Sequence, residues 1–467
     1  MTESVIADTG QASTTRNRAI IVVLCSAAFM AMLDVFVVNV AFTDIGQDFS
    51  GSSLADLSWV LNAYTIVYAA LLIPAGRLAD RHGRKAGFLV GLTVFTLASV
   101  ACAAAPSLWF LVAFRVLQAA GAAALTPTSL GLLLTSLPPE KRAGAVKVWA
   151  TTSSVAGALG PVVGGALVQI SWQWVFLINL PIGVAALAAA WRIVPDSRDE
   201  SVTRTPDLLG AAVLAVAVGA LSLGMVKGNE WSWTDAVIVA AFVVAVLGLA
   251  LFVVRIFTHP APVINPALLK VPTFVWANIT ALVFCVAFSA VFTSVVLWLE
   301  NVADYNTLIT GLALVPGPAM VPFFAIVGQK LDKLIPINAV TAIGNLLFAI
   351  GAVLLAVSAS TEVNYALQIL PGWVIIGIGI GLALPNMIAA ATVDLPAAQA
   401  ATGSAVVNTS RQLGYVLGLA ILVVVLGSLD VTREHALTVF RHGWWAIALI
   451  AAVSAATALG ITSRTNK

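Results

Sequence analysis

Charged residues are scarce in this chain: 9% of its 467 residues are Asp, Glu, Lys or Arg, whereas 60% are hydrophobic. Soluble domains carry about 25% charged residues, so a water-soluble fold of this composition would leave most of its surface apolar. The formal net charge is only +2, which gives no electrostatic case for nucleic acid as a partner. The composition therefore favours a protein that has the lipid bilayer as its solvent.

Cysteine and histidine are also rare. The three cysteines (Cys25, Cys102 and Cys285) lie in apolar stretches, and the four histidines have no metal-ligand spacing, which argues against a disulfide framework and a metal site. We find no phosphate-binding P-loop, no His-Glu-x-x-His helix and no nucleophile elbow. The sequence therefore predicts neither an enzyme nor a cofactor, and any transport must use an ion gradient or the gradient of the substrate itself.

Long apolar runs dominate what is present. A membrane-spanning helix needs about 20 mostly apolar residues, and fourteen segments meet this length. They are 19–42, 57–76, 86–105, 107–131, 145–169, 173–193, 208–226, 235–256, 273–299, 308–328, 337–358, 364–389, 402–426 and 441–462. The first segment follows a polar stretch and is too long for a signal peptide, so we expect an uncleaved helix. An even number of spans puts both termini on one side.

The basic residues are distributed unevenly between the two sides. Of the 23 Lys and Arg residues, 18 fall on the side of the N-terminus, three on the other side (Lys227, Arg433 and Arg441), and two inside helices (Arg115 and Arg411). Cytoplasmic loops carry the excess of Lys and Arg. We therefore expect both termini in the cytoplasm and a multi-pass protein of the cell (cytoplasmic or inner) membrane.

A short motif occurs twice, as Gly76-x-x-x-Asp80-Arg81 after the second segment and as Gly328-x-x-x-Asp332-Lys333 after the tenth. Transporters are commonly built from such repeats, with the site between them. The pattern predicts an all-α membrane protein with two six-helix bundles and two inserted helices. The expected parts are a cytoplasmic tail (1–18), an N-terminal bundle (19–193), the inserted helices 7 and 8 with their linkers (194–271), a C-terminal bundle (272–462) and a second tail (463–467).

Asp34 is the most informative residue, because it is a carboxylate in the middle of the first apolar segment. A charge there costs about 2.5–3.5 kcal/mol on insertion scales, so Asp34 should face a bundle interior or a wet cavity. Burial disfavours the charged form of a carboxyl, which makes Asp34 a candidate proton carrier or, alternatively, a structural partner of a buried base. Arg115 in the fourth segment must likewise find a partner, either as a modulator of Asp34 or as a static tie between helices.

Two further motifs predict conformational roles. The loop 76–85 gathers Gly76, Asp80, Arg81, Gly83 and Arg84, and such a charge cluster is either a latch for one conformation or an ordinary basic turn. The fifth segment carries small residues that permit close helix packing, together with a proline that removes a backbone hydrogen bond. This candidate hinge consists of Gly157, Gly160, Pro161, Gly164 and Gly165.

Several polar residues within apolar segments are candidates to line a cavity or to bond between helices. They are Asn39, Gln118, Asn386, Asn408, Arg411 and Gln412. Glu300 ends the ninth segment at the predicted outer interface, where we expect it to be solvated, with a role in substrate or proton passage as the alternative. Pro316, Pro318 and Pro322 should bend the tenth segment.

Together these motifs resemble the major facilitator superfamily, specifically its fourteen-helix drug:proton antiporter branch, over nearly the whole chain. The stretches that carry the resemblance are Leu33–Ala41, Trp59–Tyr64, Gly76–Lys85, Arg115–Gly121, Gly157–Gly165, Trp172–Gly183 and Ser410–Gly414. The resemblance implies alternating access between two bundles, with Asp34 as proton carrier and Arg115 as its modulator. It also implies export of small amphipathic, often cationic, drugs or antibiotics by a protein we expect to be a monomer.

The sequence leaves other functions open. One is a dedicated exporter of a single endogenous metabolite or antibiotic. An importer or uniporter is a second, although the glycine-proline motif of the fifth segment resembles that of antiporters. A membrane scaffold or sensor without transport is a third, and it would not need Asp34 or Arg115 in the core.

Overall fold

The computed structural model describes residues 2–49, 51–199, 204–360, 362–395, 397–427 and 433–462, and these residues are helical with connecting turns. Within them, thirteen helices are long and apolar enough to span a membrane. The remaining expected segment, 145–169, lies in α6 (Pro139–Val168), of which Leu159–Val168 is a shorter apolar stretch. A polytopic helical fold is the expected answer to lipid, because helices satisfy their own backbone hydrogen bonds.

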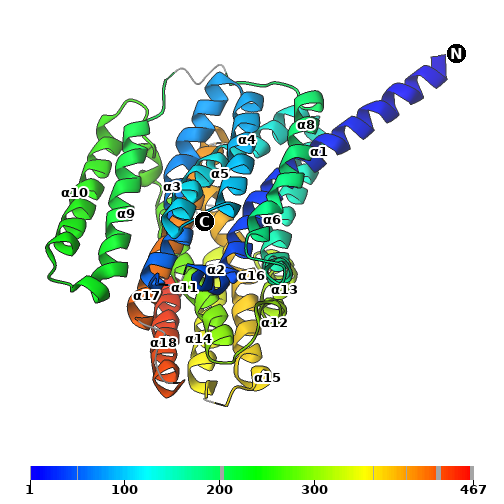
Figure 1. Cartoon of the computed structure of the whole chain (residues 1–467). Helices are drawn as coiled ribbons and strands as arrows, with labels where there is room; N and C mark the ends of the chain where they lie inside the picture. Colours follow the sequence, from blue (N-terminus) through cyan, green and yellow to red (C-terminus); the bar gives the residue numbers. More distant parts are fainter. Residues whose placement is uncertain are drawn as a thin grey trace.

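The helices form two bundles and an additional pair (Figure 1). The N-terminal bundle contains α1 (Thr2–Val40), α2 (Phe42–Asp48), α3 (Leu54–His82), α4 (Arg84–Ala103), α5 (Leu108–Ser136), α6, α7 (Trp174–Leu177) and α8 (Asn179–Ile193). The pair is α9 (Leu208–Trp231) and α10 (Ala236–Thr258), followed by the 3-10 helix η1 (Pro266–Lys270). The C-terminal bundle contains α11 (Pro272–Asn301), α12 (Thr307–Leu314), α13 (Pro316–Leu331), α14 (Ile337–Ser358), α15 (Tyr365–Gln368), α16 (Leu370–Val393), α17 (Ala397–Leu426) and α18 (Arg433–Ala458).

Local sequence explains where several helices begin and break. Ser53 and Asp56 form a reciprocal capping box at the start of α3, which satisfies backbone N–H groups that would otherwise lack an acceptor. The predicted bend of the tenth segment is present, because the helix is interrupted between α12 and α13 immediately before Pro316. Proline cannot donate the backbone hydrogen bond that would continue the helix through this point.

The two bundles pack their helices in the same pairs. In the N-terminal bundle α4 lies against α5 and α1 against α6, and in the C-terminal bundle the corresponding pairs are α14 with α16 and α11 with α17. Glycines allow the close contact of α4 with α5 and of α14 with α16. Gly91 packs on the backbone of Gly121, and Gly344 packs on that of Gly379. The repeated loop motif has the same setting too, since Gly76 packs on α5 and Gly328 lies beside α16.

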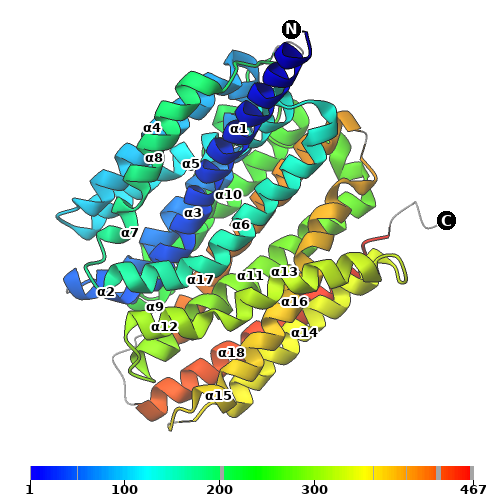
Figure 2. The same ribbon diagram turned by 90° about the vertical axis from the view of Figure 1, so that its right-hand side faces the viewer.

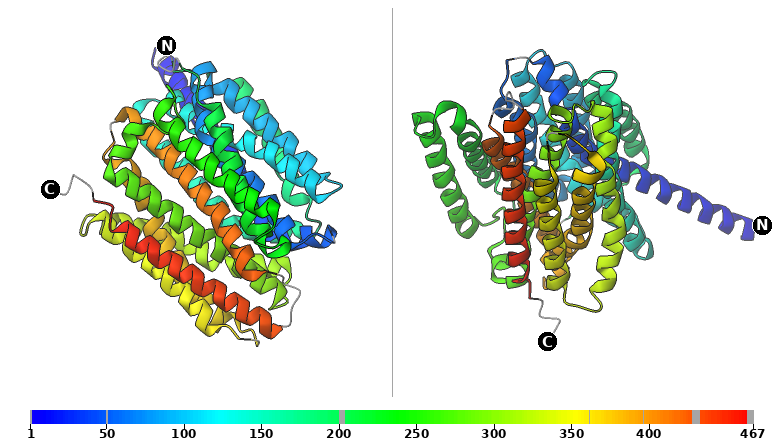
Figure 3. Two further views of the ribbon diagram at one scale, coloured as in Figure 1. Left: turned by 90° about the vertical axis from the view of Figure 1, so that its left-hand side faces the viewer. Right: turned by 90° about the horizontal axis from the view of Figure 1, so that it is seen from below.

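Helices α9 and α10 lie outside the two bundles (Figure 1; Figure 3, right). They pack against each other, and α9 also contacts α3 of one bundle and α17 of the other. Asn62 of α3 donates a hydrogen bond to Ser222 of α9 (3.3 Å), and Asn229 of α9 donates one to the carbonyl of Val424 on α17 (2.8 Å). The inserted pair therefore covers the α3–α17 seam.

The bundles meet along two seams, α3 with α17 and α6 with α12 (Figure 2). We call the end of the molecule that carries the loop 76–85 the basic face and the other end the opposite face. Along α6, packing against the other bundle is much more extensive at α12, near the opposite face, than at α13. Along the α6 seam, the two bundles are therefore in closer contact at the opposite face than at the basic face.

Candidate functional site

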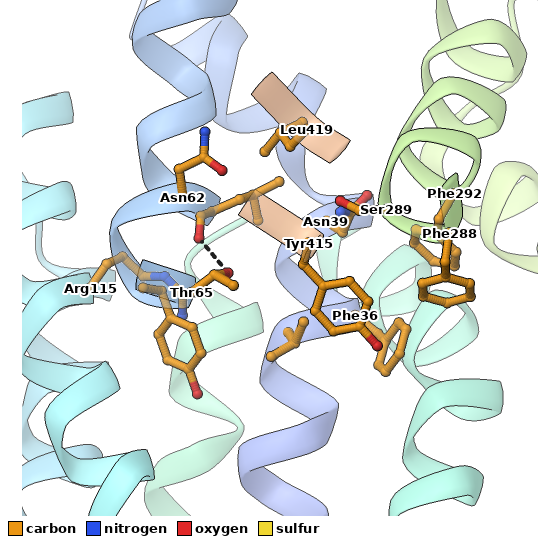
Figure 4. Close-up of a pocket in the computed structure, with 13 residues that line it drawn as sticks. Phe36, Asn39, Asn62, Thr65, Arg115, Phe288, Ser289, Phe292, Tyr415 and Leu419 are labelled. Carbon is orange, nitrogen blue, oxygen red and sulfur yellow. Dashed lines mark hydrogen bonds between the residues drawn. The ribbon is translucent and has the colours of Figure 1, made fainter. Parts of the chain in front are cut away.

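A cavity lies between the bundles, near the middle of the membrane-spanning helices (Figure 4). It encloses about 550 Å³ of space including its opening. Its lining is aromatic and polar but, among the described residues, contains no Asp or Glu. The lining residues are Val35, Phe36, Asn39, Leu61, Asn62, Tyr64, Thr65, Arg115, Phe288, Ser289, Phe292, Tyr415 and Leu419.

Asp34 lies inside the N-terminal bundle, and only 1% of its surface is exposed. Its Oδ2 accepts a hydrogen bond from Nη1 of Arg115 at 2.5 Å. Its Oδ1 accepts two more, from Nε2 of Gln118 (2.8 Å) and from Nδ2 of Asn179 (3.0 Å). The carboxylate is therefore held by side chains from two other helices, α5 and α8. The two amides that bond to it also bond to Ser99 of α4.

Arg115 connects this buried carboxylate to the cavity. Its Nη1 contacts Asp34, its Nε donates to the carbonyl of Val60 (3.1 Å), and its guanidinium lies 4.1 Å from the ring centre of Tyr64. Arg115 and Tyr64 line the cavity, whereas Asp34 does not. A change at Arg115 therefore acts on Asp34 and on the cavity wall together.

A second set of acidic residues closes the opposite face. Thr43 donates a hydrogen bond to Glu300 (2.5 Å), and Thr307 donates one to Asp44 (2.8 Å). Both bonds join the N-terminal to the C-terminal bundle. Burial raises the pKa of Asp44 above its ordinary value, although the bond from Thr307 acts in the other direction.

Glu300 is not solvated as the sequence led us to expect. Its Oε1 is shut away from water and has no hydrogen-bond partner among the described residues. The reason is packing between bundles, since the end of α11 lies against α2 instead of facing the outer interface. Glu300 belongs to the closure of the opposite face and does not line the central cavity.

The glycines of α6 lie at the same closure. A side-chain carbon at Gly165 would lie 2.6 Å from the carbonyl oxygen of Thr307 on α12. Gly311 of α12 in turn packs on the carbonyl of Pro161, and Gly160 packs on Phe36 of α1. These glycines let α6 approach both α1 in its own bundle and α12 in the other.

The segment 76–85, predicted as a loop, is helical apart from Gly83, because 76–82 end α3 and 84–85 begin α4. It is bonded to the linkers on the basic face. Gly83 has φ +126°, a conformation that favours glycine, and lets α4 start directly after α3. Arg84 pairs with Asp80 at 2.6 Å and donates its backbone N–H to Ser197 (2.7 Å), and Arg77 donates to the carbonyl of Pro262 (2.8 Å).

The remaining candidates are scattered. Asn39 lines the cavity and donates to Thr293 (3.2 Å), and Gln118 belongs to the Asp34 network. Asn386 donates to Asp332, at the end of α13 (3.2 Å). Asn408 and Arg411 bond to each other (3.0 Å) next to the cavity-lining Tyr415. Gln412 is outside the cavity lining.

The sequence reasoning missed Ser99, Asn179 and Tyr64 as parts of the site. Ser99 and Asn179 are fully buried in apolar helices. Ser and Asn are unremarkable residues in membrane helices, so only their polarity at that depth could have pointed to them.

Comparison with known protein families shows which family this chain belongs to. The family model described as Major Facilitator Superfamily matches residues 24–419. The chain belongs to this superfamily. It is therefore a multi-pass membrane transporter and not an enzyme, as the sequence predicted, and its two-bundle architecture is that of the family.

Relatives within the superfamily are named for drug resistance. The chain is 34% identical to the methylenomycin A resistance protein of Bacillus subtilis over 414 residues, which is 87% of each chain. It is 33% identical to the multidrug resistance protein Stp of Mycobacterium tuberculosis, over 87% of this chain and 75% of that protein. Among solved structures, a bacterial homologue of the human lysosomal transporter Spinster has the same fold, with a TM-score of 0.68 and 16% identity over 94% of this chain and 95% of that one.

Proposed function

We propose that this protein exports small amphipathic compounds, including antibiotics, in exchange for protons by alternating access. Relatives at 33–34% identity that are named for antibiotic and multidrug resistance support export. The basic face would lie in the cytoplasm of a bacterial cell, because it carries most of the Lys and Arg residues.

The observation that carries the proton coupling is the pair of Asp34 and Arg115. Asp34 is the acidic member of a buried ion pair at 2.5 Å, and Arg115 is at once its partner and part of the cavity wall. Removing one partner of a buried pair costs about 3–5 kcal/mol. Protonation of Asp34 neutralises the carboxylate and releases the guanidinium, so the state of the proton site reaches the cavity through one side chain.

The transport cycle follows from this link. With the opposite face closed, Asp34 releases its proton toward the cytoplasm and pairs with Arg115, and a compound from the cytoplasm enters the central cavity. The bundles then rock to open the opposite face, and the compound leaves. Protonation of Asp34 from that side permits the return. The membrane potential contributes about 2.3 kcal/mol per charge per 100 mV.

The cavity also bears on the charge of the substrate. The resemblance implied often cationic substrates, but no Asp or Glu is among the described lining residues. Because the lining offers a cation aromatic rings and amides but no carboxylate to neutralise it, we favour neutral or acidic compounds. A single dedicated substrate remains the alternative to a broad range.

Drug susceptibility tests this function. A bacterial strain lacking its major efflux pumps, expressing the wild-type chain, should tolerate methylenomycin A or other antibiotics of a structurally diverse panel at several-fold higher concentration. Asp34→Asn should remove this tolerance at equal membrane expression. Tolerance to one compound alone would identify a dedicated exporter.

Treatment with a protonophore tests whether efflux needs the proton gradient. It should abolish efflux by the wild type. Efflux that survives both the protonophore and Asp34→Asn would refute proton exchange, and intracellular accumulation caused by expression would refute export.

A further inference from the structure

Arg411 is a second cation at the centre of the membrane and, unlike Arg115, it has no acidic partner. It lies near the middle of the apolar span Thr402–Leu426 of α17. Its Nη1 donates to Asn408 (3.0 Å) and its Nη2 to the hydroxyl of Tyr415 (3.2 Å), both on the same helix. The thiol of Cys285 on α11 is a further hydrogen-bond partner, and all three groups are neutral. No Asp or Glu among the described residues forms an ion pair with it.

The guanidinium is left incompletely satisfied. Its Nε is shut away from water and has no acceptor, whereas Nε of Arg115 has the carbonyl of Val60. Arginine carries five N–H donors and keeps its charge in proteins. A charge at this depth costs about 2.5–3.5 kcal/mol on insertion scales, and such residues mark ligand pathways more often than static contacts.

The position of Arg411 relates it to the cavity. Residues four apart lie on one face of a helix, so Arg411, Tyr415 and Leu419 form one stripe along α17. Tyr415 and Leu419 line the cavity, and Figure 4 shows Tyr415 beside Phe288 of α11. Arg411 lies one turn further along the stripe, about 6 Å toward the basic face, and its side chain is only partly buried.

The charges around the cavity point to the ligand. Among the described residues, Arg115 is the one cation in the cavity lining, and it is already neutralised by Asp34. Arg411 lies next to the lining residue Tyr415 and has no acidic counter-ion among the same residues. We propose that Arg411 binds the carboxylate of exported compounds, so that the substrate class is amphipathic aromatic or aliphatic acids. A carboxylate suits the site because it can accept two parallel N–H bonds from one guanidinium.

This proposal rests on the proposed function, because it names the substrates of the same cavity. Carboxylate recognition at Arg411 does not involve Asp34, so binding and proton coupling can be measured separately. Asn408 and Tyr415 hold the guanidinium in place, and the apolar part of the substrate would lie against Phe288 and Phe292.

Matched pairs of probes test the proposal on the purified full-length protein. The probes are phenylacetic, indoleacetic and pyrenebutyric acids and their primary amides, and calorimetric titration measures their affinities. At least one acid should bind the wild type more tightly than its amide. Arg411→Gln should weaken that acid about tenfold or more, as expected for hydrogen bonds to charged groups, and change the amide less than about twofold.

Two further variants complete the test. Arg411→Lys keeps the charge but loses the planar arrangement of N–H donors, so it should weaken binding of the acid by an intermediate factor. It replaces Arg411→Gln in the test if that variant does not yield a monodisperse protein. Arg441→Gln is the matched control, since Arg441 also has a buried Nε without a partner. It lies on α18, donates to the carbonyl of Ala359 and does not share the stripe of Tyr415 and Leu419, so the change should leave both affinities unchanged.

The outcomes are distinct. Equal weakening of acid and amide by Arg411→Gln, or no preference for any acid over its amide in the wild type, would overturn the carboxylate site. Acid binding that depends on Arg411 in a protein that moves no protons would leave this site standing and remove the proposed antiport. Asp34→Asn should retain acid binding in either case.

Discussion

At the scale of single residues, the account depends on polar side chains that are buried together. Asp34 is surrounded by three donors, and Asn179 is the one contributed by the most distant part of the sequence. Its amide bonds to the carboxylate (3.0 Å) and to Ser99 (3.3 Å) without any exposed surface. A hydrogen bond to a charged group contributes about 1.5–3 kcal/mol, so this side chain both stabilises the bundle and orients Asp34.

Asn179→Ala should therefore lower the midpoint of thermal unfolding of the purified protein by several degrees and reduce proton-driven transport. Asn338→Ala is the control, because Asn338 bonds to no charged group: it donates a long bond of 3.5 Å to the carbonyl of Leu459 and accepts one from the backbone N–H of Ala339 (2.9 Å). Thermal unfolding followed by tryptophan fluorescence measures both. If the two variants were equally stable, the Asp34 network would not contribute to the fold.

At the scale of helices, the closure of the opposite face depends on contacts between α2, α6, α11 and α12. Gly165 of α6 has no room for a side chain beside Thr307, whereas Gly144 at the other end of the same helix has open space around it. A methyl group at position 165 would separate the helices, since buried backbone atoms cannot move away without cost.

Gly165→Ala should shift the protein toward conformations with a more open opposite face, and Gly144→Ala should not. Spin labels at Gln47→Cys and Ile309→Cys, both exposed and one on each bundle, report the separation of α2 and α12. An unchanged distance distribution in Gly165→Ala would contradict this role of the glycine.

The same labels test a pH dependence of the closure. Burial raises the pKa of Asp44 above its ordinary 3.8 in the closed arrangement, and the neighbouring Asp48 acts in the same direction, whereas the Thr307 bond opposes them. On opening, Asp44 becomes solvated, so the closed state binds more protons above pH 3.8. Acidification should therefore favour the closed opposite face, and a rise in pH through the raised pKa should weaken it.

Asp44→Asn should flatten this response. Label distances measured from neutral pH down to the ordinary pKa of 3.8 record it. A closed population that grows as the pH rises, or an unaltered response in Asp44→Asn, would argue against Asp44 as the sensor. The predicted direction fits proton uptake from the opposite face, because protonation there favours the return step.

At the scale of the whole molecule, much of the fold could be predicted from composition alone. A chain that spans lipid has few alternatives to helices, so each long apolar run was expected to form a helix. Helix ends were less predictable: α18 begins at Arg433 and not near residue 441, since its polar first turns need not lie in hydrocarbon. The site residues with charge, Asp34 and Arg115, were recognisable from their depth. Asn179 and Ser99 beside them were not, because a Ser or Asn in an apolar helix carries no local signal. The bond between Thr43 and Glu300 was not predictable either, because these residues are 257 positions apart in sequence.

The most direct test of the account measures protons and substrate together in proteoliposomes. Purified protein is reconstituted with a trapped pH-sensitive dye, and a compound identified by the susceptibility panel is added. We expect the wild type to move protons against the direction of the substrate, and Asp34→Asn to exchange labelled for unlabelled substrate without any proton movement. Proton movement of wild-type size in Asp34→Asn, or substrate transport by the wild type that ignores the pH gradient, would contradict it.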